Sequence, residues 1–218
     1  MKEKIIQAIR DLDDEQALGL VREMLEATSD ITGILDILNS GMEEIGNLYE
    51  AGTYYIADLI MAGYIYRCVL DMEEVCTFLE KKQNDAQAKG SIVICTVEGD
   101  IHDIGKDIFV SLARSKGFIV YDLGVDTKPE QILDFILSNP VDILAMSGII
   151  TESITYMKKT MDILASCSLK KCQKILLGGL NFSKEIRIYI GADYAATSAK
   201  DGLQKCIEWI NEKNNDSE

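Results

Sequence analysis

Over the first 82 residues, apolar side chains recur at the spacing of one helix face. The pattern predicts a short helix over residues 3–9 and a second helix that begins at residue 13. A third helix follows the N-cap candidates at residues 28–30, and a fourth runs from about residue 55 to 79. Four helices separated by short breaks predict a small four-helix bundle, which forms a separate domain over residues 1–82.

The pattern changes after a polar stretch, KKQNDAQAKG, which predicts a linker over residues 83–90. Apolar β-branched runs then alternate with helical segments. Strands are predicted over 91–97, 118–123, 141–147, 174–177 and 194–196, and helices over 104–116, 129–137, 152–166 and 199–213. This alternation predicts the α/β class, with a flavodoxin-like (Rossmann-like) doubly wound parallel sheet over residues 91–218.

The net charge of −14 narrows the classes of partner. Such an acidic surface repels phosphate backbones and anionic lipid, so nucleic acid and membrane are poor partners. Residues 1–89 carry 8 Lys and Arg against 18 Asp and Glu, which is a net charge of −10. No apolar run has transmembrane length and no signal peptide is visible, so we expect a cytoplasmic protein.

The six cysteines do not form a C-x-x-C pair, and their spacing fits neither a disulfide framework nor a zinc site. We expect reduced thiols, with Cys95 buried because it lies in an apolar run.

Candidate chemistry gathers where the predicted strands end, and ligands of doubly wound sheets bind beyond those ends. EGDIHDIG follows the first strand, SGIITES ends the third, and two glycines end the fourth. The first of these segments holds the chain's single histidine, His102, two residues after Asp100. A carboxylate can fix the tautomer of an imidazole and raise its strength as a metal ligand.

One histidine cannot build an ordinary protein-ligated metal site, which needs three or four ligands. A macrocycle would supply the equatorial ligands and leave one axial position for His102. The alternative is a partly buried histidine whose hydrogen bond to Asp100 is purely structural, and spacing alone leaves both open.

The ordered set Asp100-x-His102-x-x-Gly105, Ser147-x-Ile149 and Gly178-Gly179 resembles the D-x-H-x-x-G, S-x-L and G-G fingerprint of B12-binding domains. Residues 41–52 (GMEEIGNLYEAG) resemble the helical cap of cobalamin-dependent methyltransferases. Over most of its length the chain is similar to the small corrinoid proteins of methylamine, methanol and O-demethylase methyltransferase systems. The cobalamin-binding module of methionine synthase is similar too.

The resemblance implies a corrinoid (cobalamin) cofactor bound base-off/His-on, with His102 as the lower ligand of cobalt. It implies that Asp100 and Ser153 complete a ligand triad and that Tyr55 of the cap shields the methyl group. Ser147 and Thr151 would contact the displaced nucleotide tail, and Gly178 and Gly179 would leave room for it. Further candidate cofactor contacts are Gly99, Ile101, Asp103, Ile104, Gly105, Ile149 and Ala199.

The function that the resemblance implies is methyl carriage through Co(I) and methyl-Co(III), by a protein that is not catalytic alone. Its expected partners are a donor-specific methyltransferase, an acceptor methyltransferase of the tetrahydrofolate or thiol type, and a reductive activator. A second copy of the chain, forming a homodimer, is a further candidate partner. The cap departs from the family pattern, because Ala57 replaces a usual Pro and Ser40 a frequent carboxylate, and Tyr64 and Tyr66 add bulk.

Three alternatives remain. The small subunit of an adenosylcobalamin mutase shares the fingerprint but lacks a helical cap. A B12-dependent regulator usually adds a basic helix-turn-helix segment, and none is visible. A flavodoxin-like domain without a corrinoid would require accidental motifs. Locally, Gly99-Asp100 could be only a turn, and Thr151 and Ser153 only an N-cap.

Overall fold

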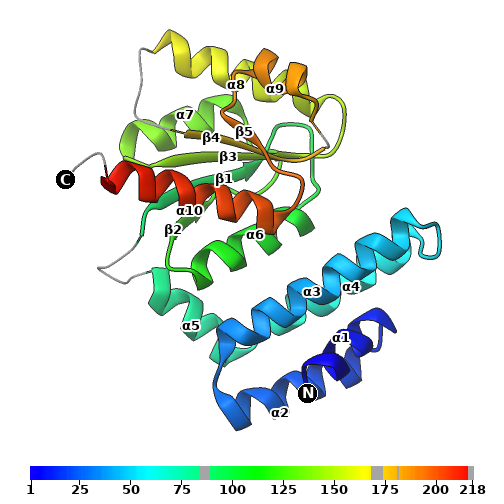
Figure 1. Cartoon of the computed structure of the whole chain (residues 1–218). Helices are drawn as coiled ribbons and strands as arrows, with labels where there is room; N and C mark the ends of the chain where they lie inside the picture. Colours follow the sequence, from blue (N-terminus) through cyan, green and yellow to red (C-terminus); the bar gives the residue numbers. More distant parts are fainter. Residues whose placement is uncertain (84–88, 168–173, 181, 216–218) are drawn as a thin grey trace. The chain divides into compact units, whose positions relative to one another are not determined.

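The structure, a computed structural model, describes residues 1–83, 89–167, 174–180 and 182–215. The chain divides into two compact units, Met1–Lys81 and Lys82–Glu218 (Figure 1). Of the predicted linker, residues 84–88 lie outside the described part of the chain. No helix among the described residues is long and apolar enough to cross a bilayer.

Two helices of the N-terminal unit begin at acidic N-cap residues. Asp13 and Asp30 accept hydrogen bonds from the N–H groups of Gln16 and Gly33, both at 2.9 Å. The helices are α1 (Lys2–Arg10), α2 (Asp14–Thr28), α3 (Ile31–Glu50), α4 (Ile56–Leu70) and α5 (Glu73–Gln83).

The prediction of a single fourth helix is wrong, because the chain turns at residues 71–72 and separates α4 from α5. The N–H of Asp71 bonds to the carbonyl of Arg67 at 2.9 Å, and that of Met72 bonds to the carbonyl of Val69 at 3.2 Å. Neither Gly nor Pro marks this turn, so the apolar pattern continues across it.

The second unit is a five-stranded sheet with every neighbouring pair parallel, in the order β2-β1-β3-β4-β5. Its strands are β1 (Ser91–Thr96), β2 (Ile119–Asp122), β3 (Ile143–Gly148), β4 (Lys174–Gly179) and β5 (Tyr194–Ala195). Its helices are α6 (Ile104–Ser115), α7 (Pro129–Ser138), α8 (Ser153–Ser166), α9 (Lys184–Ile190) and α10 (Ala199–Asn215). The predicted fold class, a helical unit followed by a flavodoxin-like doubly wound sheet, is confirmed.

The sequence prediction omitted helix α9. Its segment, IRIYI, alternates like a strand and hides a seven-residue helix. The end signals are nevertheless present, because Ser183 accepts a hydrogen bond from the N–H of Ile186 and Gly191 ends the helix at φ +93°.

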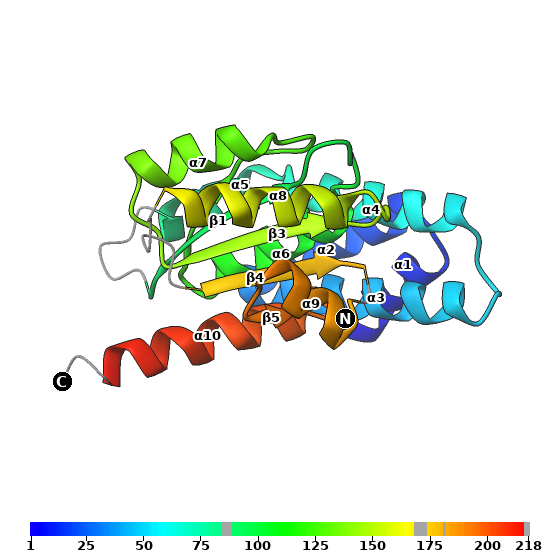
Figure 2. The ribbon, with the colours of Figure 1, turned by 90° about the horizontal axis from the view of Figure 1, so that it is seen from above.

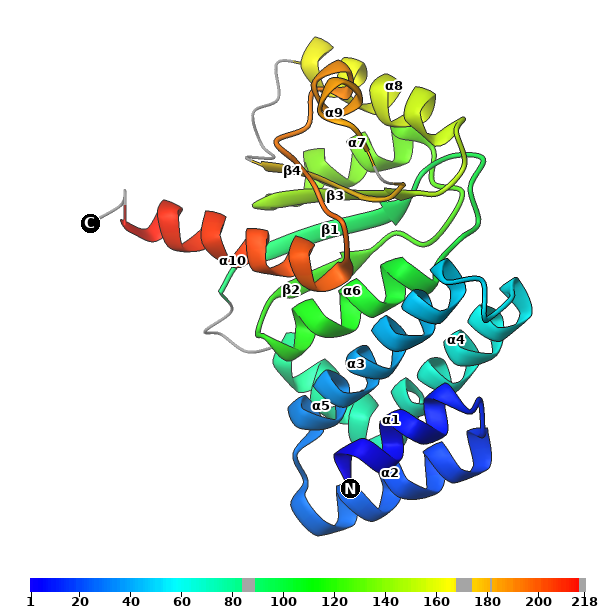
Figure 3. The ribbon, with the colours of Figure 1, turned by 45° about the vertical axis from the view of Figure 1, so that its right-hand side comes forward.

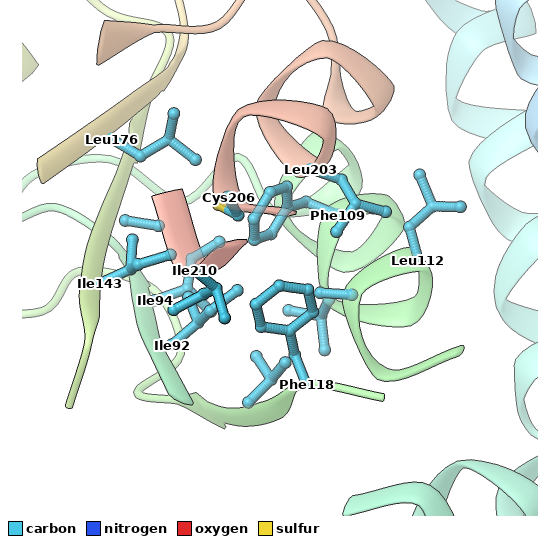
Figure 4. Packing of buried hydrophobic residues seen from close by; sticks show 14 of the residues in the cluster. Ile92, Ile94, Phe109, Leu112, Phe118, Ile143, Leu176, Leu203, Cys206 and Ile210 are labelled. Atoms are coloured by element: carbon cyan, nitrogen blue, oxygen red, sulfur yellow. The ribbon is translucent and has the colours of Figure 1, made fainter. Parts of the chain in front are cut away.

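Alternate residues of the strands face two separate cores. Helices α6 and α10 cover one face of the sheet, and α7 and α8 cover the other (Figures 2 and 3). On the first face, Ile92 and Ile94 of β1 pack with Phe109 and Phe118 (Figure 4). The second core takes Val93 and Cys95 from the same strand, with side chains of α7, α8 and α9. Burial on both faces explains the continuous apolar runs of the strands.

Cys95 is fully buried, as predicted, and burial raises the pKa of its thiol to about 12. Among the described residues the free thiols are Cys68, Cys76, Cys95, Cys167 and Cys206. Cys172 lies outside the described part of the chain.

Candidate functional site

The carboxyl ends of β1, β3 and β4 bring the motif segments together. Thr96 pairs in register with Ser147, and Ser147 with Gly178, so these residues form one row across the sheet. The loop over residues 97–103 and the loop over residues 149–152 begin just beyond that row. Segments about 50 residues apart in the sequence therefore share one site.

Asp100 is the centre of this site. It is 1% exposed and accepts five hydrogen bonds. One carboxylate oxygen accepts from the backbone N–H of His102 at 3.0 Å and lies 2.6 Å from its Nδ1. The other accepts from the N–H groups of Ile149 at 2.6 Å and Ile150 at 3.2 Å, and from the hydroxyl of Ser153 at 2.9 Å. The predicted triad of His102, Asp100 and Ser153 is therefore assembled in one network.

This network keeps Asp100 ionised. Burial alone would raise the pKa of the carboxyl group, but the N–H groups of Ile149 and His102 and the His102 side chain hold the pKa well below its ordinary range. A carboxylate only accepts hydrogen bonds, so Nδ1 of His102 is the donor. In the neutral ring the lone pair then lies on Nε2, which is the nitrogen available to a metal.

The His102 ring is accessible, with 53% of its side chain exposed. Within the described residues, Nε2 has no hydrogen-bond partner. Three apolar side chains in the neighbouring loops are also exposed: Ile101 by 72%, Ile149 by 45% and Val125 by 38%. Apolar exposure around one unpartnered nitrogen suits a broad apolar ligand that offers a metal to that nitrogen.

A cavity of about 220 Å³ extends from His102 between the sheet and the first turns of α6 and α10. Its inner part is apolar, with Ile94, Ala145 and Leu176 side by side on neighbouring strands. Of the residues predicted to bind the cofactor, the following line it: His102, Gly105, Ser147, Ile149, Gly178, Gly179 and Ala199.

Glycine is present at positions near the carboxyl ends of the strands for different physical reasons. A Cβ on Gly178 would meet no atom within 4 Å, so its missing side chain leaves cavity space. A Cβ on Gly179, which has φ +107°, would lie 2.3 Å from the Gly148 carbonyl oxygen. A Cβ on Gly148 would lie 2.4 Å from that of Ser153. Gly148 and Gly179 thus permit the close approach that brings Ser153 to Asp100.

The alternative that Ser153 serves only as an N-cap is wrong. The N-cap position of α8 is Glu152, which makes no side-chain capping bond, and the Ser153 hydroxyl bonds to Asp100 instead. Thr151 is exposed in the preceding turn. Asp103 occupies the N-cap position of α6 without a side-chain capping bond, and Ile104 is the first residue of that helix.

Sequence reasoning missed a buried lysine beside the site. Lys106 is 4% exposed, lines the cavity, and pairs with Asp107 at 2.8 Å and Asp122 at 2.5 Å. Burial lowers the pKa of Lys106, but the two carboxylates more than offset it and leave the pKa raised. Its position directly after Gly105, at the start of an apolar helix, was the available signal.

Two further residues that sequence reasoning did not identify hold the loop that carries His102. The hydroxyl of Thr96, which is fully buried, donates to the His102 carbonyl oxygen at 3.0 Å. Asp126 contacts the same loop through its side chain and its backbone. Thr96 could have been noticed as the hydroxyl that ends an apolar strand, whereas nothing in the sequence distinguishes Asp126 from an ordinary turn residue.

In the helical unit the tyrosines separate by environment. Tyr66 is buried and donates to Asn39 at 3.2 Å, and the Tyr54 hydroxyl donates to the Arg10 carbonyl, so both support the bundle. Tyr55 is 74% exposed and is held locally through its backbone, because its N–H donates to Asp58 at 2.7 Å and its carbonyl accepts from the N–H of Asp58 at 3.0 Å.

Comparison with known proteins relates both units of the chain to B12-binding proteins. Residues 90–205 match the family model of the B12 binding domain, and residues 1–72 match a second model of the same description. The chain is 31% identical to trimethylamine corrinoid protein 1 of Methanosarcina mazei, over 94% of this chain and 96% of that protein.

Solved structures agree. A cobalamin-binding protein from Desulfitobacterium hafniense DCB-2 is 34% identical, with a TM-score of 0.63 over 96% of this chain and 98% of the other. The Methanosarcina barkeri monomethylamine corrinoid protein is 26% identical, with a TM-score of 0.72 over 94% and 96%. The methanol:cobalamin methyltransferase complex MtaBC of the same organism is 25% identical, with a TM-score of 0.55 over 95% and 78%. The chain therefore belongs to the B12-binding corrinoid proteins of methyltransferase systems, and its cofactor is a corrinoid.

Proposed function

We propose that this chain carries a methyl group between two methyltransferases on a corrinoid bound base-off, with His102 as the lower ligand of cobalt. One observation carries the proposal. The Nδ1 of His102 lies 2.6 Å from a buried carboxylate that has four other donors, while its Nε2 has no hydrogen-bond partner in the described part of the chain and the residue lines a cavity.

The residues around His102 fit a corrinoid. A corrinoid bound base-off needs an axial nitrogen, an apolar surface below the macrocycle and space for the nucleotide tail. His102 would supply the nitrogen, and exposed Ile101 and Ile149 the apolar surface. The cavity would take the tail, with the hydroxyl of Ser147 on its wall and open space at Gly178.

When bound, the corrinoid would supply a cobalt centre able to accept and release a methyl group, and His102 would hold that cobalt in place of the cofactor's own base. The chain supplies orientation and proton control. Asp100 stays ionised and holds a proton on Nδ1, so a proton taken up by the triad would reside on Nε2 of His102 and compete with metal ligation. Ser153 keeps the second oxygen of Asp100 satisfied and so fixes the carboxylate plane.

We infer that the helical unit contributes Tyr55 to the upper face of the corrinoid. The ring is exposed, and its hydroxyl has no hydrogen-bond partner among the residues of the unit that the structure describes, unlike those of Tyr54 and Tyr66. Replacing Tyr55 with Ala should leave cobalamin affinity unchanged and speed the light-driven loss of the methyl group from bound methylcobalamin. An unchanged photolysis rate would remove Tyr55 from the site.

The proposed partners are a donor-specific methyltransferase and an acceptor methyltransferase. The MtaBC structure is a complex named for a methyltransferase, and its relation to this chain supports a partner of that class. The net charge of −10 over residues 1–89 favours a partner with a basic docking surface.

The first experiment is a UV–visible titration of the apoprotein with methylcobalamin and hydroxocobalamin. One-to-one binding with a base-off/His-on spectrum is expected for the wild type. His102→Ala should lose that spectrum, and added imidazole should restore it by filling the vacated position. A spectrum unchanged in His102→Ala would refute the ligand assignment.

The second experiment tests carriage itself. The loaded protein is incubated with candidate donor methyltransferases and their substrates, and then with a thiol or tetrahydrofolate acceptor enzyme. Methylation and demethylation of the bound corrinoid are followed by its spectrum. Adenosylcobalamin serves as the comparison ligand, because selective retention of the adenosyl form with no methyl transfer would favour the mutase class.

A further inference from the structure

The loop that carries Asp100 and His102 contains a glycine, Gly99, directly before Asp100, and hydrogen bonds to two other segments hold it. Gly99 lies at φ +80°, a conformation that glycine adopts readily and can readily leave. On one side the loop is held through the Asp100 side chain, which bonds to Ile149, Ile150 and Ser153. The backbone on its other side faces the segment that follows β2.

That second support is Asp126. Its side chain accepts the Gly99 N–H at 2.7 Å, and its own N–H donates to the Asp100 carbonyl at 3.0 Å. The two bonds hold the Glu98–Gly99 peptide group and the Asp100–Ile101 peptide group, and so fix the backbone before Gly99 and after Asp100. Neighbouring bonds place the segment itself, because the N–H of Thr127 donates to the Thr96 carbonyl at 3.0 Å and the N–H of Thr96 to the Gly124 carbonyl at 2.9 Å.

The conformation of Asp126 limits which residue can do this. Its φ is +50°, in the left-handed region that Asp and Asn tolerate better than other residues with a side chain. The position therefore requires both this backbone geometry and an acceptor oxygen one carbon beyond Cβ. Asn meets both requirements, Gly meets only the backbone requirement, and Ala meets neither.

We propose that Asp126 is a positioning residue for the corrinoid ligand: it clamps the backbone of Gly99 and Asp100 so that Asp100 can aim the His102 ring. The inference rests on the proposed role of His102 as the cobalt ligand. It assigns no contact between Asp126 and the cofactor.

The test compares Asp126→Asn with Asp126→Gly, which share a permitted backbone and differ in the acceptor. Asp126→Asn should keep the wild-type affinity and His-on spectrum. Asp126→Gly should bind methylcobalamin about tenfold more weakly and show a smaller His-on fraction. Ser29→Gly is the matched control, because Ser29 lies at φ +52° in the helical unit and should leave binding unchanged.

Two readouts do not depend on a bound corrinoid. In the apoprotein, NMR of the single histidine should show a hydrogen-bonded Nδ1–H in the wild type and Asp126→Asn, weakened in Asp126→Gly. Amide exchange of wild-type Gly99 should be slow for a loop residue, and this measurement needs no variant to fold.

Wild-type affinity, spectrum and histidine NMR in Asp126→Gly would overturn the proposal, as would unprotected exchange at Gly99. If His102→Ala leaves the corrinoid spectrum unchanged, the proposed function fails instead. The histidine NMR and the Gly99 exchange would still decide whether Asp126 clamps the loop.

Discussion

Two carboxylates tie the same pair of strands, β1 and β3, at opposite ends of the sheet. Asp142 precedes β3 at the amino end and accepts the N–H of Ser91 at 2.7 Å, its hydroxyl at 2.9 Å, and Lys213 Nζ at 2.6 Å. Asp100 follows β1 at the carboxyl end and accepts two N–H groups from the loop after β3. Both carboxylates have a pKa held below the ordinary range despite burial.

The two ends of the sheet differ in whether the partners of the carboxylate leave an atom and space for a ligand. At the amino end the carboxylate meets a lysine ammonium group, and a Cβ on nearby Gly90 would collide with Ile210 at 2.7 Å. At the carboxyl end the partner is a histidine whose second nitrogen has no partner among the residues described, and Gly178 lines a cavity. The same anchoring device is thus structural at one end and leaves a ligand-binding atom and space at the other.

Replacing each carboxylate with an amide should separate the two ends most strongly. In Asp100→Asn either orientation of the amide points its NH₂ at fixed donors, namely Ile149 and Ile150 or the backbone N–H of His102. We expect a loss of about 2–4 kcal/mol in unfolding free energy and loss of the His-on spectrum. Urea unfolding of the apoprotein and a cobalamin titration measure the two effects.

Asp142→Asn is the matched control, because its oxygen can still accept from Ser91 while Lys213, 45% exposed, turns to solvent. It should lose about 1 kcal/mol or less and keep the His-on spectrum. Equal losses of stability in the two variants would mean that the ends are not different in kind.

Filling the glycine at each end tests where the empty space lies. Gly178→Val should weaken cobalamin binding about 10- to 100-fold while changing stability by less than about 1 kcal/mol. Cobinamide, which lacks the nucleotide tail, should bind as it does to the wild type. Gly90→Val should do the reverse, costing about 1–3 kcal/mol of stability with no change in affinity. If Gly178→Val weakens cobinamide equally, the cavity does not receive the tail.

The site residues at the carboxyl end of the sheet could be predicted from the sequence far better than the residues that hold their loop in place. Asp100, His102 and Ser153 belong to short motifs at strand ends, and parallel strands bring such ends together, so their assembly could be foreseen. Thr96 and Asp126 act through bonds to backbone groups of a loop whose path is set by the fold. Sequence spacing does not predict such a bond for a hydroxyl in a strand or an aspartate in a turn.

Missed elements of the fold have equally local causes. The turn at residues 71–72 lacks Gly and Pro, so apolar spacing ran across it. Helix α9 was hidden by alternation, although Ser183 and Gly191 marked its ends. Apolar periodicity reports which side chains are buried, and it is weakest where a short element buries few of them.

The hydroxyl of Thr96 gives a smaller test of the carboxyl end. Thr96→Val keeps the shape but leaves the His102 carbonyl without its donor, which should cost about 1–2 kcal/mol and reduce the His-on fraction. Thr96→Ser keeps the hydroxyl and loses a methyl group, so its stability falls by about 1 kcal/mol with the spectrum retained. Identical spectra for the two variants would show that this hydroxyl does not position His102.

The smallest expected effect is the pH dependence of the stability that Asp142 contributes at the amino end of the sheet. Burial alone would raise the pKa of Asp142, but Lys213 and Ser91 lower it, so the folded state holds its carboxylate more strongly than the unfolded chain, where the pKa is about 3.9. The stability from this group is therefore fully present above about pH 4 to 5 and is lost as the pH falls through the lower folded value. The difference in unfolding free energy between the wild type and Asp142→Asn should stay constant from pH 7 to about 5 and shrink towards pH 3. A difference that grows on acidification would mean that Asp142 is not held as a carboxylate, and the resemblance between the two ends of the sheet would be one of geometry alone.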